Sequence, residues 1–189
     1  MRNSFANQLP ASRPFGIDNL DINATVTVRI ATPQDIPEMI RLERQCSTAA
    51  HWTDQQYGSL WAAQERSTRL ALIAERGMSA ASGDLIPTLI GFLVARHLAP
   101  EWELENIVVA PDSRRSGIGT RLMEELLARA KQTNSDAVFL EVRESNAAAQ
   151  AVYHKLDFKQ IGCRKSYYAN PTEDAILYSK PLRTNLTRP

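Results

Sequence analysis

Runs of alternating or continuously apolar residues recur along the chain and predict β-strands. The first clear run, TVTVRI at residues 25–30, is rich in β-branched side chains. A later run at residues 101–109 is followed by Pro111, which cannot donate a hydrogen bond to a β-ladder and so marks the end of that strand. The strands predicted in this way cover residues 25–30, 69–75, 88–96, 101–109, 137–142, 158–163 and 175–179.

Between these strands, apolar residues spaced three and four apart predict amphipathic helices. The clearest stripe consists of Ile118, Leu122, Leu126 and Ala130. Helices are predicted over about residues 33–43, 54–65, 117–131 and 146–155, and the small and polar residues 77–83 predict a loop.

The mixed order of strands and helices predicts an α/β (α+β) domain with one central sheet. A chain of 189 residues with 43% hydrophobic residues is long and apolar enough for one sizeable core. Residues 1–24 show no clear period and are expected to form a flexible extension. The folded domain is therefore expected over residues 25–182, with a short C-terminal tail at 183–189.

Charge and hydropathy narrow the classes of partner. The 22 basic and 21 acidic side chains leave a formal net charge of +1. Because a duplex-binding protein usually carries a basic stripe or domain, nucleic acid is not expected as a partner. No apolar run is as long as a membrane span, and the N-terminus lacks an apolar signal segment, so no membrane association is expected. The sequence does not indicate an oligomeric state.

The histidines and cysteines predict neither a metal site nor a disulfide framework. His51, His97 and His154 lack metal-ligand spacing, so no metal is expected. Cys46 and Cys163 lie far apart and form no CxxC pair, which favours a reducing, cytoplasmic location. Cys163 falls in a predicted strand and is expected in the core rather than as a nucleophile.

The segment RRSGIG at residues 114–119 lies between a predicted strand and a predicted helix. A helix start presents unpaired N–H groups at the positive end of the helix dipole and so forms an anion site. Gly117 and Gly119 allow the backbone to approach a bulky pyrophosphate, and Arg114 and Arg115 add positive charge. The alternative is a basic surface turn capped by glycines. The position after an apolar strand favours phosphate binding, although neither a GxGxxG nor a GK[ST] pattern is present.

This loop begins a longer series of motifs. It fits the pattern Arg/Gln-x-x-Gly-x-Gly/Ala at Arg114, Gly117 and Gly119. The series continues with LEVRESNAAA at 140–149, Tyr153, LDF at 156–158, RKSYY at 164–168 and EDA at 173–175. Over about residues 25–182 the chain thereby resembles the GNAT acetyltransferase superfamily. Within it, the chain looks like the RimI-type branch, which acetylates the N-terminal alanine of a small ribosomal subunit protein.

The resemblance implies a fold and a set of roles. The fold would be a single mixed, mostly antiparallel sheet of six to seven strands with about four helices. The cosubstrate would be acetyl-CoA, and the acceptor a peptide N-terminus such as that of a ribosomal protein. Main-chain groups of Ile107, Val108 and Val109 would pair with the pantetheine arm; Arg114, Arg115, Ser116, Gly117, Ile118, Gly119 and Thr120 would cradle the pyrophosphate; Asn146 would contact the cofactor; Glu141 would be the general base and Tyr153 the general acid.

Elementary chemistry is compatible with these roles. An α-amine has a reference pKa of about 7.7–8.0, against about 10.4 for lysine, so it needs only modest help from a carboxylate base. Glu141 shares a strand face with Phe139 and Arg143; its alternative role is a solvated glutamate paired with a surface cation. Tyr153 lies two helical turns after Asn146, so both project from one helix face, and its ring can also pack on the sheet.

Two other glutamates are rival bases. Glu103 and Glu105 lie on the predicted strand 101–109, where many GNAT enzymes outside the RimI-type branch place their base. Strict alternation puts both on the same face as Ile107 and Val109.

Three aromatic residues are candidates for the acceptor side. Trp52 precedes a predicted helix, where a hydrophobic staple or core position is favoured over a peptide-groove wall. Tyr167 and Tyr168 should alternate faces, one packed and the other toward the cleft. The N-terminal extension and the loop at 76–84 depart from the compact family pattern and could reshape the acceptor side. A lysine or small-amine acceptor, or a non-catalytic CoA-binding module, therefore remains an alternative.

Overall fold

A computed structural model describes residues 25–62, 68–79 and 85–183. The expected extension at 1–24 and residues 184–189 of the expected tail lie outside the described residues. The strands are β1 Val26–Ile30, β2 Arg69–Ser79, β3 Leu85–Leu98, β4 Glu101–Val109, β5 Ala137–Arg143, β6 Lys159–Ala169 and β7 Thr172–Pro181. The helices are α1 Ile36–Arg44, α2 Asp54–Ser59, α3 Ile118–Gln132 and α4 Ala147–Lys155, with 3-10 turns η1 Pro33–Asp35 and η2 Pro111–Ser113.

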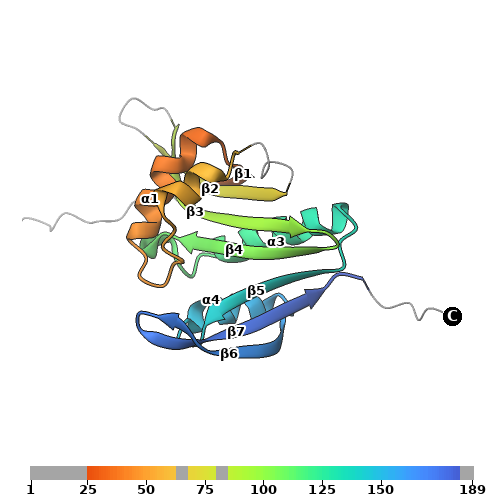
Figure 1. The fold of residues 1–189 in the computed structure, drawn as a ribbon. Helices are drawn as coiled ribbons and strands as arrows, with labels where there is room; N and C mark the ends of the chain where they lie inside the picture. Colours follow the sequence, from red (N-terminus) through yellow and green to blue (C-terminus); the bar gives the residue numbers. More distant parts are fainter. Residues whose placement is uncertain (1–24, 63–67, 80–84, 184–189) are drawn as a thin grey trace, which may run out of the picture.

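The strands form one seven-stranded sheet in the order β1-β2-β3-β4-β5-β7-β6 (Figure 1). Neighbouring strands are antiparallel except for β4 and β5, which are parallel. Helix α3 connects these two strands along the chain, as a parallel pair requires a crossover. The predicted α/β fold with one mixed, mostly antiparallel sheet is confirmed.

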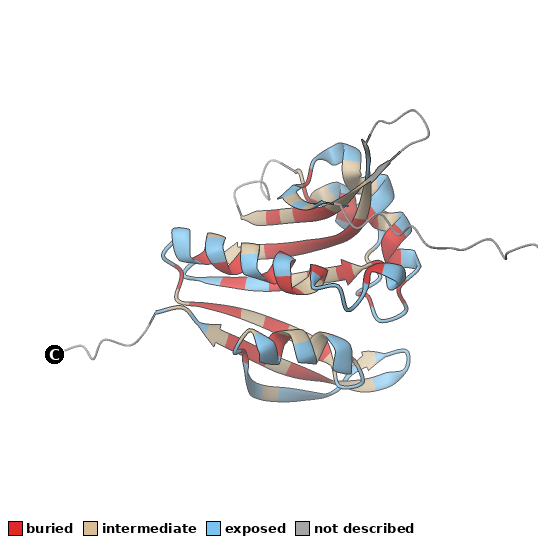
Figure 2. Ribbon diagram, turned by 180° about the vertical axis from the view of Figure 1, so that it is seen from behind, coloured by how far each residue is buried: buried red, intermediate tan, exposed pale blue. Residues whose placement is uncertain are grey.

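Helices cover both faces of the sheet. Helices α3 and α4 lie on one face, and α1 lies on the other (Figure 1). Figure 2, seen from the α3 side, shows exposed positions on the outer faces of α3 and α4 and buried positions toward the sheet. Gly91 of β3 allows close packing of α3, because a Cβ there would lie 3.1 Å from Ile118 Cγ2 and 3.0 Å from the Val108 carbonyl oxygen.

Several predicted boundaries differ from the structure. The predicted loop at 77–83 begins later, because residues 77–79 continue β2 and pair with β3; residues 80–84 lie outside the described part. Helix α2 ends at Ser59 rather than near residue 65, and residues 63–67 are not described. Strands β6 and β7 extend toward each other beyond the predicted runs because their hairpin continues the ladder through polar positions, which hydrophobic periodicity does not detect.

Strands β4 and β5 separate partway along their length. They pair only from Glu101–Ala137 to Leu104–Leu140, and they diverge toward their C-terminal ends (Figure 1). Between β3 and β4, Ala95 pairs with Leu104 and Val94 pairs with Asn106. Glu105 of β4 is therefore an extra residue without a partner on β3, and it forms a β-bulge. The bulge bends β4 at the point where its pairing with β5 ends.

Candidate active site

Because β4 separates from β5, the main chain in the second half of β4 has no partner among the described strands on the side that faces β5. The Ala110 N–H donates to the Ile90 carbonyl of β3 at 2.9 Å, so by antiparallel alternation Ile107 and Val109 direct their amide groups away from β3. The Val109 carbonyl accepts weak contacts from Arg114 Nε at 3.4 Å and Cys46 Sγ at 3.6 Å. An extended ligand arm can therefore pair with this edge as an added strand would.

The phosphate-loop candidate lies at the end of this edge. Residues 114–117 are exposed, and α3 begins at Ile118, so the first N–H groups of the helix point outward without intrahelical acceptors. Gly117 caps the helix with φ +84°, a left-handed conformation that favours glycine. A Cβ on Gly119 would meet Val109 and Val152 only at 3.8 Å, so the protein's own packing does not require a glycine there. Close approach of a ligand provides a physical reason for it.

Helix α4 begins on the other side of the gap. Its N-cap is Asn146, whose side-chain oxygen accepts from the Ala149 N–H at 3.2 Å. The predicted cofactor contact of Asn146 therefore coexists with a capping role that already uses the amide oxygen. The amide nitrogen of the same side chain has no hydrogen-bond partner among the described residues.

Tyr153 projects from α4 into the core, with only 3% of its surface exposed. Its ring packs against Phe158 and Tyr178, with centroids 5.9 and 6.1 Å away. Burial, with a smaller contribution from Tyr168, raises the pKa of the Tyr153 hydroxyl, so this group keeps its proton at neutral pH. Its hydroxyl forms no hydrogen bond with any residue that the structure describes.

Glu141 lies on the opposite face of the sheet from Tyr153. Val138, Leu140 and Val142 are buried on the α4 side, whereas Phe139, Glu141 and Arg143 are half-buried on the other, as predicted. Glu141 is the first β5 residue beyond the last pair with β4, so it sits where the strands separate. Its carboxylate, in a side chain 23% exposed, forms an ion pair of 3.1 Å with Arg164 of β6.

The sheet face predicted for the rival bases Glu103 and Glu105 is wrong. The bulge at Glu105 reverses the alternation, so Val109 points toward Gly119 on the α3 side while Glu105 pairs with Arg69 on the α1 side. Cross-strand pairing also aligns Glu103 with Arg69 through the β3 strand. Both glutamates therefore share a face with Glu141 rather than with Val109.

These two glutamates differ in their environments. Arg69 binds both carboxylate oxygens of Glu105 at 3.0 and 3.1 Å, so no oxygen of Glu105 is without a cation. Glu103 is more exposed, and its pKa is raised by partial burial and by the negative charges of Glu105 and Glu141. Of the two rivals, Glu103 is the one whose environment suits proton transfer.

A buried polar network that sequence reasoning missed joins α1 to β4 and to the segment before α2. Glu43 is 2% exposed and accepts from Asn106 Nδ2 at 2.7 Å and from the Trp52 N–H at 3.0 Å. The signal was present, since Glu43 continues the apolar stripe of its helix, where a charged side chain needs a buried partner. Trp52 itself packs on Tyr57, with ring centroids 5.6 Å apart, as a hydrophobic staple before α2, which is one of the two packing roles predicted for it.

The β6 strand corrects two expectations. Cys163 is exposed rather than in the core, because β6 is an edge strand whose residues are mostly exposed. Tyr167 and Tyr168 do not point to opposite faces: a register shift and a positive φ at Ser166 bring their rings to 5.2 Å. Tyr168 is half-buried, and the guanidinium carbon of Arg143 lies 4.0 Å from the centroid of its ring. Tyr167 is exposed.

Across residues 25–62, 68–79 and 85–183, no cluster of three or more His, Cys, Asp or Glu side chains is arranged to hold a metal ion. In the same ranges, no helix has the length and apolar character needed to cross a membrane.

The diverging strands, the exposed glycine loop and the helix that follows it together define a CoA-dependent acyltransferase fold. Residues 36–158 match the family model described as "Acetyltransferase (GNAT) family", and the chain belongs to this family. It is therefore an acyl-CoA-dependent N-acetyltransferase.

Particular relatives refine the comparison. The [ribosomal protein bS18]-alanine N-acetyltransferase of Salmonella typhimurium is 32% identical over 158 residues, which cover 82% of this chain and 97% of the relative. The Escherichia coli enzyme of the same name is 30% identical over the same shares. The crystal structure of the Escherichia coli ribosomal-protein-S18-alanine N-acetyltransferase superposes with a TM-score of 0.68 at 26% identity, covering 87% of this chain and 100% of that one. Arabidopsis thaliana NAA60 in complex with acetyl-CoA shares the fold, with a TM-score of 0.72 at 15% identity and coverage of 84% and 99%.

Proposed function

We propose that this protein transfers the acetyl group of acetyl-CoA to the N-terminal α-amine of a protein, such as an N-terminal alanine of a ribosomal protein. The observation that carries the proposal is the separation of β4 from β5, which leads from Glu141 to the glycine loop. The alanine specificity in the names of the bS18 relatives supports the acceptor. Two free cysteines support a reducing, cytoplasmic compartment.

In the proposed complex, the pantetheine arm pairs with the main chain of residues 107–109, and residues 114–120 hold the pyrophosphate. The exposed helix start and its two arginines support this placement. Asn146 borders the same gap at the start of α4. The whole domain, residues 25–182, forms the catalytic unit in this proposal.

The proposed reaction is direct transfer. Glu141 takes a proton from the acceptor amine, and the amine nitrogen forms a bond with the thioester carbonyl carbon. The C–S bond then breaks, and Tyr153 gives its proton to the departing thiolate. The opposite faces of Glu141 and Tyr153 support this division, because a thioester in the gap would have the base on one side and the acid on the other. The raised pKa of Tyr153 keeps that proton available at neutral pH.

A set of single substitutions tests the base. Glu141→Gln, Glu103→Gln and Glu105→Gln are compared by kcat/KM against pH with a peptide that begins with alanine. We expect Glu141→Gln to lower kcat by about 10²-fold or more and to remove the acidic limb of the profile. If Glu141→Gln keeps the wild-type profile while Glu103→Gln loses it, the base is Glu103.

A glycine pair tests the cofactor loop separately from the chemistry. Gly119→Ala should keep its stability, because the new Cβ finds only ordinary contacts at 3.8 Å, but should weaken acetyl-CoA binding measured by calorimetry. Gly58→Ala is the matched control, since its Cβ also meets nothing close and it lies on α2. Equal acetyl-CoA affinity in both variants would contradict the loop's assignment.

A peptide array decides between acceptors. Peptides that begin with alanine, internal-lysine peptides and small amines are incubated with acetyl-CoA and the full chain. Acetylation of the alanine α-amine supports the proposal, and acetylation only of lysine or small amines refutes its acceptor. Acetyl-CoA binding with no transfer to any acceptor would indicate the non-catalytic alternative.

A further inference from the structure

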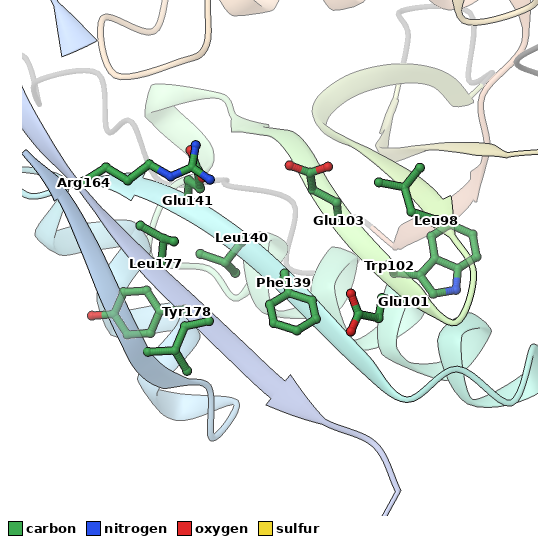
Figure 3. A pocket seen from close by; sticks show the side chains of 11 residues that line it. Leu98, Glu101, Trp102, Glu103, Phe139, Leu140, Glu141, Arg164, Leu177 and Tyr178 are labelled. Carbon is green, nitrogen blue, oxygen red and sulfur yellow. The ribbon is translucent and has the colours of Figure 1, made fainter. Parts of the chain in front are cut away.

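A pocket of about 240 Å³ adjoins Glu141 on the α1 side of the sheet, next to the paired halves of β4 and β5. Figure 3 shows Glu141 and Arg164 at one end and Leu98 and Trp102 at the other, with Phe139 and Glu103 between them. Its lining combines apolar side chains with carboxylates. The apolar residues are Leu98, Phe139, Ile161 and Leu177, and Glu101 and Glu103 carry carboxylates without an ion-pair partner in the part of the chain that the structure describes. Two of the apolar residues, Leu98 and Ile161, are among the most exposed large hydrophobic residues of the described chain, at 46% and 56%.

The charges of this pocket are unbalanced. Arg164 is paired with Glu141, and Arg69 is paired with Glu105 outside the pocket lining. Among the described residues, the side chains of Glu101 and Glu103 form neither a hydrogen bond nor an ion pair, although Arg96 of β3 lies opposite Glu103 in the ladder. Burial is the largest cause of the raised pKa of Glu103, followed by repulsion from Glu105 and Glu141, while the nearby cations Arg96 and Arg164 act in the opposite direction. A further cation beside Glu103 would offset the remaining repulsion.

The pocket is also at a suitable distance from the proposed base. Phe139, on the pocket floor, precedes Glu141 by two strand residues, about 7 Å at 3.3 Å per residue. In an extended acceptor, the second Cα lies about 5 Å from the terminal amine. With the amine at Glu141, the second side chain of the acceptor therefore starts at the mouth of this pocket.

We propose that this pocket binds the second side chain of the acceptor and selects a lysine or arginine there. The aliphatic stem of such a side chain would pack on Phe139 and Leu98, and its cationic head would lie between Glu101 and Glu103. Lysine and arginine combine an apolar stem with a charged tip, which matches a pocket with an apolar floor and acidic walls. This inference rests on the proposed N-terminal acetylation.

The test compares acetyl acceptors that differ only at position two. Peptides beginning Ala-Lys, Ala-norleucine and Ala-Glu are otherwise identical, and norleucine keeps the length of the lysine stem without its charge. We expect kcat/KM to fall in that order, with lysine about tenfold above norleucine and less so at 1 M NaCl because salt screens the pair. Equal kcat/KM for the lysine and norleucine peptides would overturn the inference.

Variants separate this role from catalysis. In the double variant Glu101→Gln/Glu103→Gln we expect the lysine-to-norleucine ratio to fall to about twofold or less. A part played by Glu103 in proton transfer would lower kcat for all peptides alike and leave that ratio unchanged, which would refute the subsite. Glu124→Gln, an exposed glutamate of α3 on the other face, is the matched control and should keep the wild-type ratio.

The two proposals can fail separately. N-terminal acetylation that is indifferent to position two would refute the pocket assignment alone. Transfer only to lysine side chains or small amines would refute both, because no second acceptor residue would then lie next to the base.

Discussion

The buried carboxylate of Glu43 is expected to contribute substantially to the free energy of unfolding. It accepts hydrogen bonds from two donors, Asn106 Nδ2 at 2.7 Å and the Trp52 N–H at 3.0 Å. In Glu43→Leu the side chain offers no acceptor, so both buried donors lose their hydrogen bonds. A buried donor left unsatisfied costs about 1–3 kcal/mol.

We therefore expect Glu43→Leu to destabilise the protein by at least about 2 kcal/mol, which lowers Tm by at least about 4 °C for a chain of this size. Urea unfolding followed by circular dichroism measures the change. The control is Glu38→Leu on the same helix, where the Glu38 side chain is 52% exposed and pairs with Arg41; it should change stability by less than about 0.5 kcal/mol.

A double-mutant cycle identifies the bond responsible. Combining Glu43→Leu with Asn106→Leu should give a coupling energy of about 0.5–3 kcal/mol, since the two wild-type side chains share one buried hydrogen bond. Wild-type stability in Glu43→Leu would refute the reasoning, and additivity of the two changes would assign the cost to the Trp52 N–H instead.

Three further predictions concern the glycine loop, the proposed acid Tyr153 and the ion pair between Arg29 and Asp35. Gly117→Ala should lower stability by about 1–2 kcal/mol from its φ of +84° alone, since a Cβ there meets nothing within 4 Å; unchanged urea unfolding would contradict this. Tyr153→Phe should unfold like the wild type but lose about 10²-fold or more in kcat, and wild-type turnover would exclude the acid role. The hydrogen bond from Arg29 lowers the pKa of Asp35, so this pair stabilises the fold above about pH 4 and its contribution is lost as pH falls through the folded pKa. Asp35→Asn should accordingly lower Tm at pH 7 but not near pH 2, and an equal difference at both pH values would refute the linkage.

Local patterns predicted the elements on either side of the glycine loop. The strand at 101–109, the glycine loop and the helix after it were all predictable, because apolar alternation, proline and glycine act on the backbone within a few residues. The lengths of β2, β3, β6 and β7 were not, because a ladder between two strands continues wherever backbone partners meet, whatever the side chains. Cys163 is exposed because β6 lies at the edge of the sheet, and that edge position depends on the strand order.

The relation among the three glutamates required the tertiary structure. Alternation alone placed Glu103 and Glu105 with Val109, and a single extra residue at the bulge reversed that face. The sequence also contained no indication that Arg69, more than thirty residues earlier, would occupy both oxygens of Glu105. The bulge and the ion pair depend on which strands become neighbours, a long-range outcome of packing.

By itself, then, the sequence determined the order of elements, the α/β class and the position of the glycine loop before α3, since each depends on backbone preferences of neighbouring residues. Only the tertiary structure decided where β4 leaves β5, which carboxylates stand free beside Glu141, and that a pocket with an apolar floor and acidic walls adjoins them. These features arise where strands distant along the chain meet, because non-local pairing sets which side chains share a face and which cations reach them.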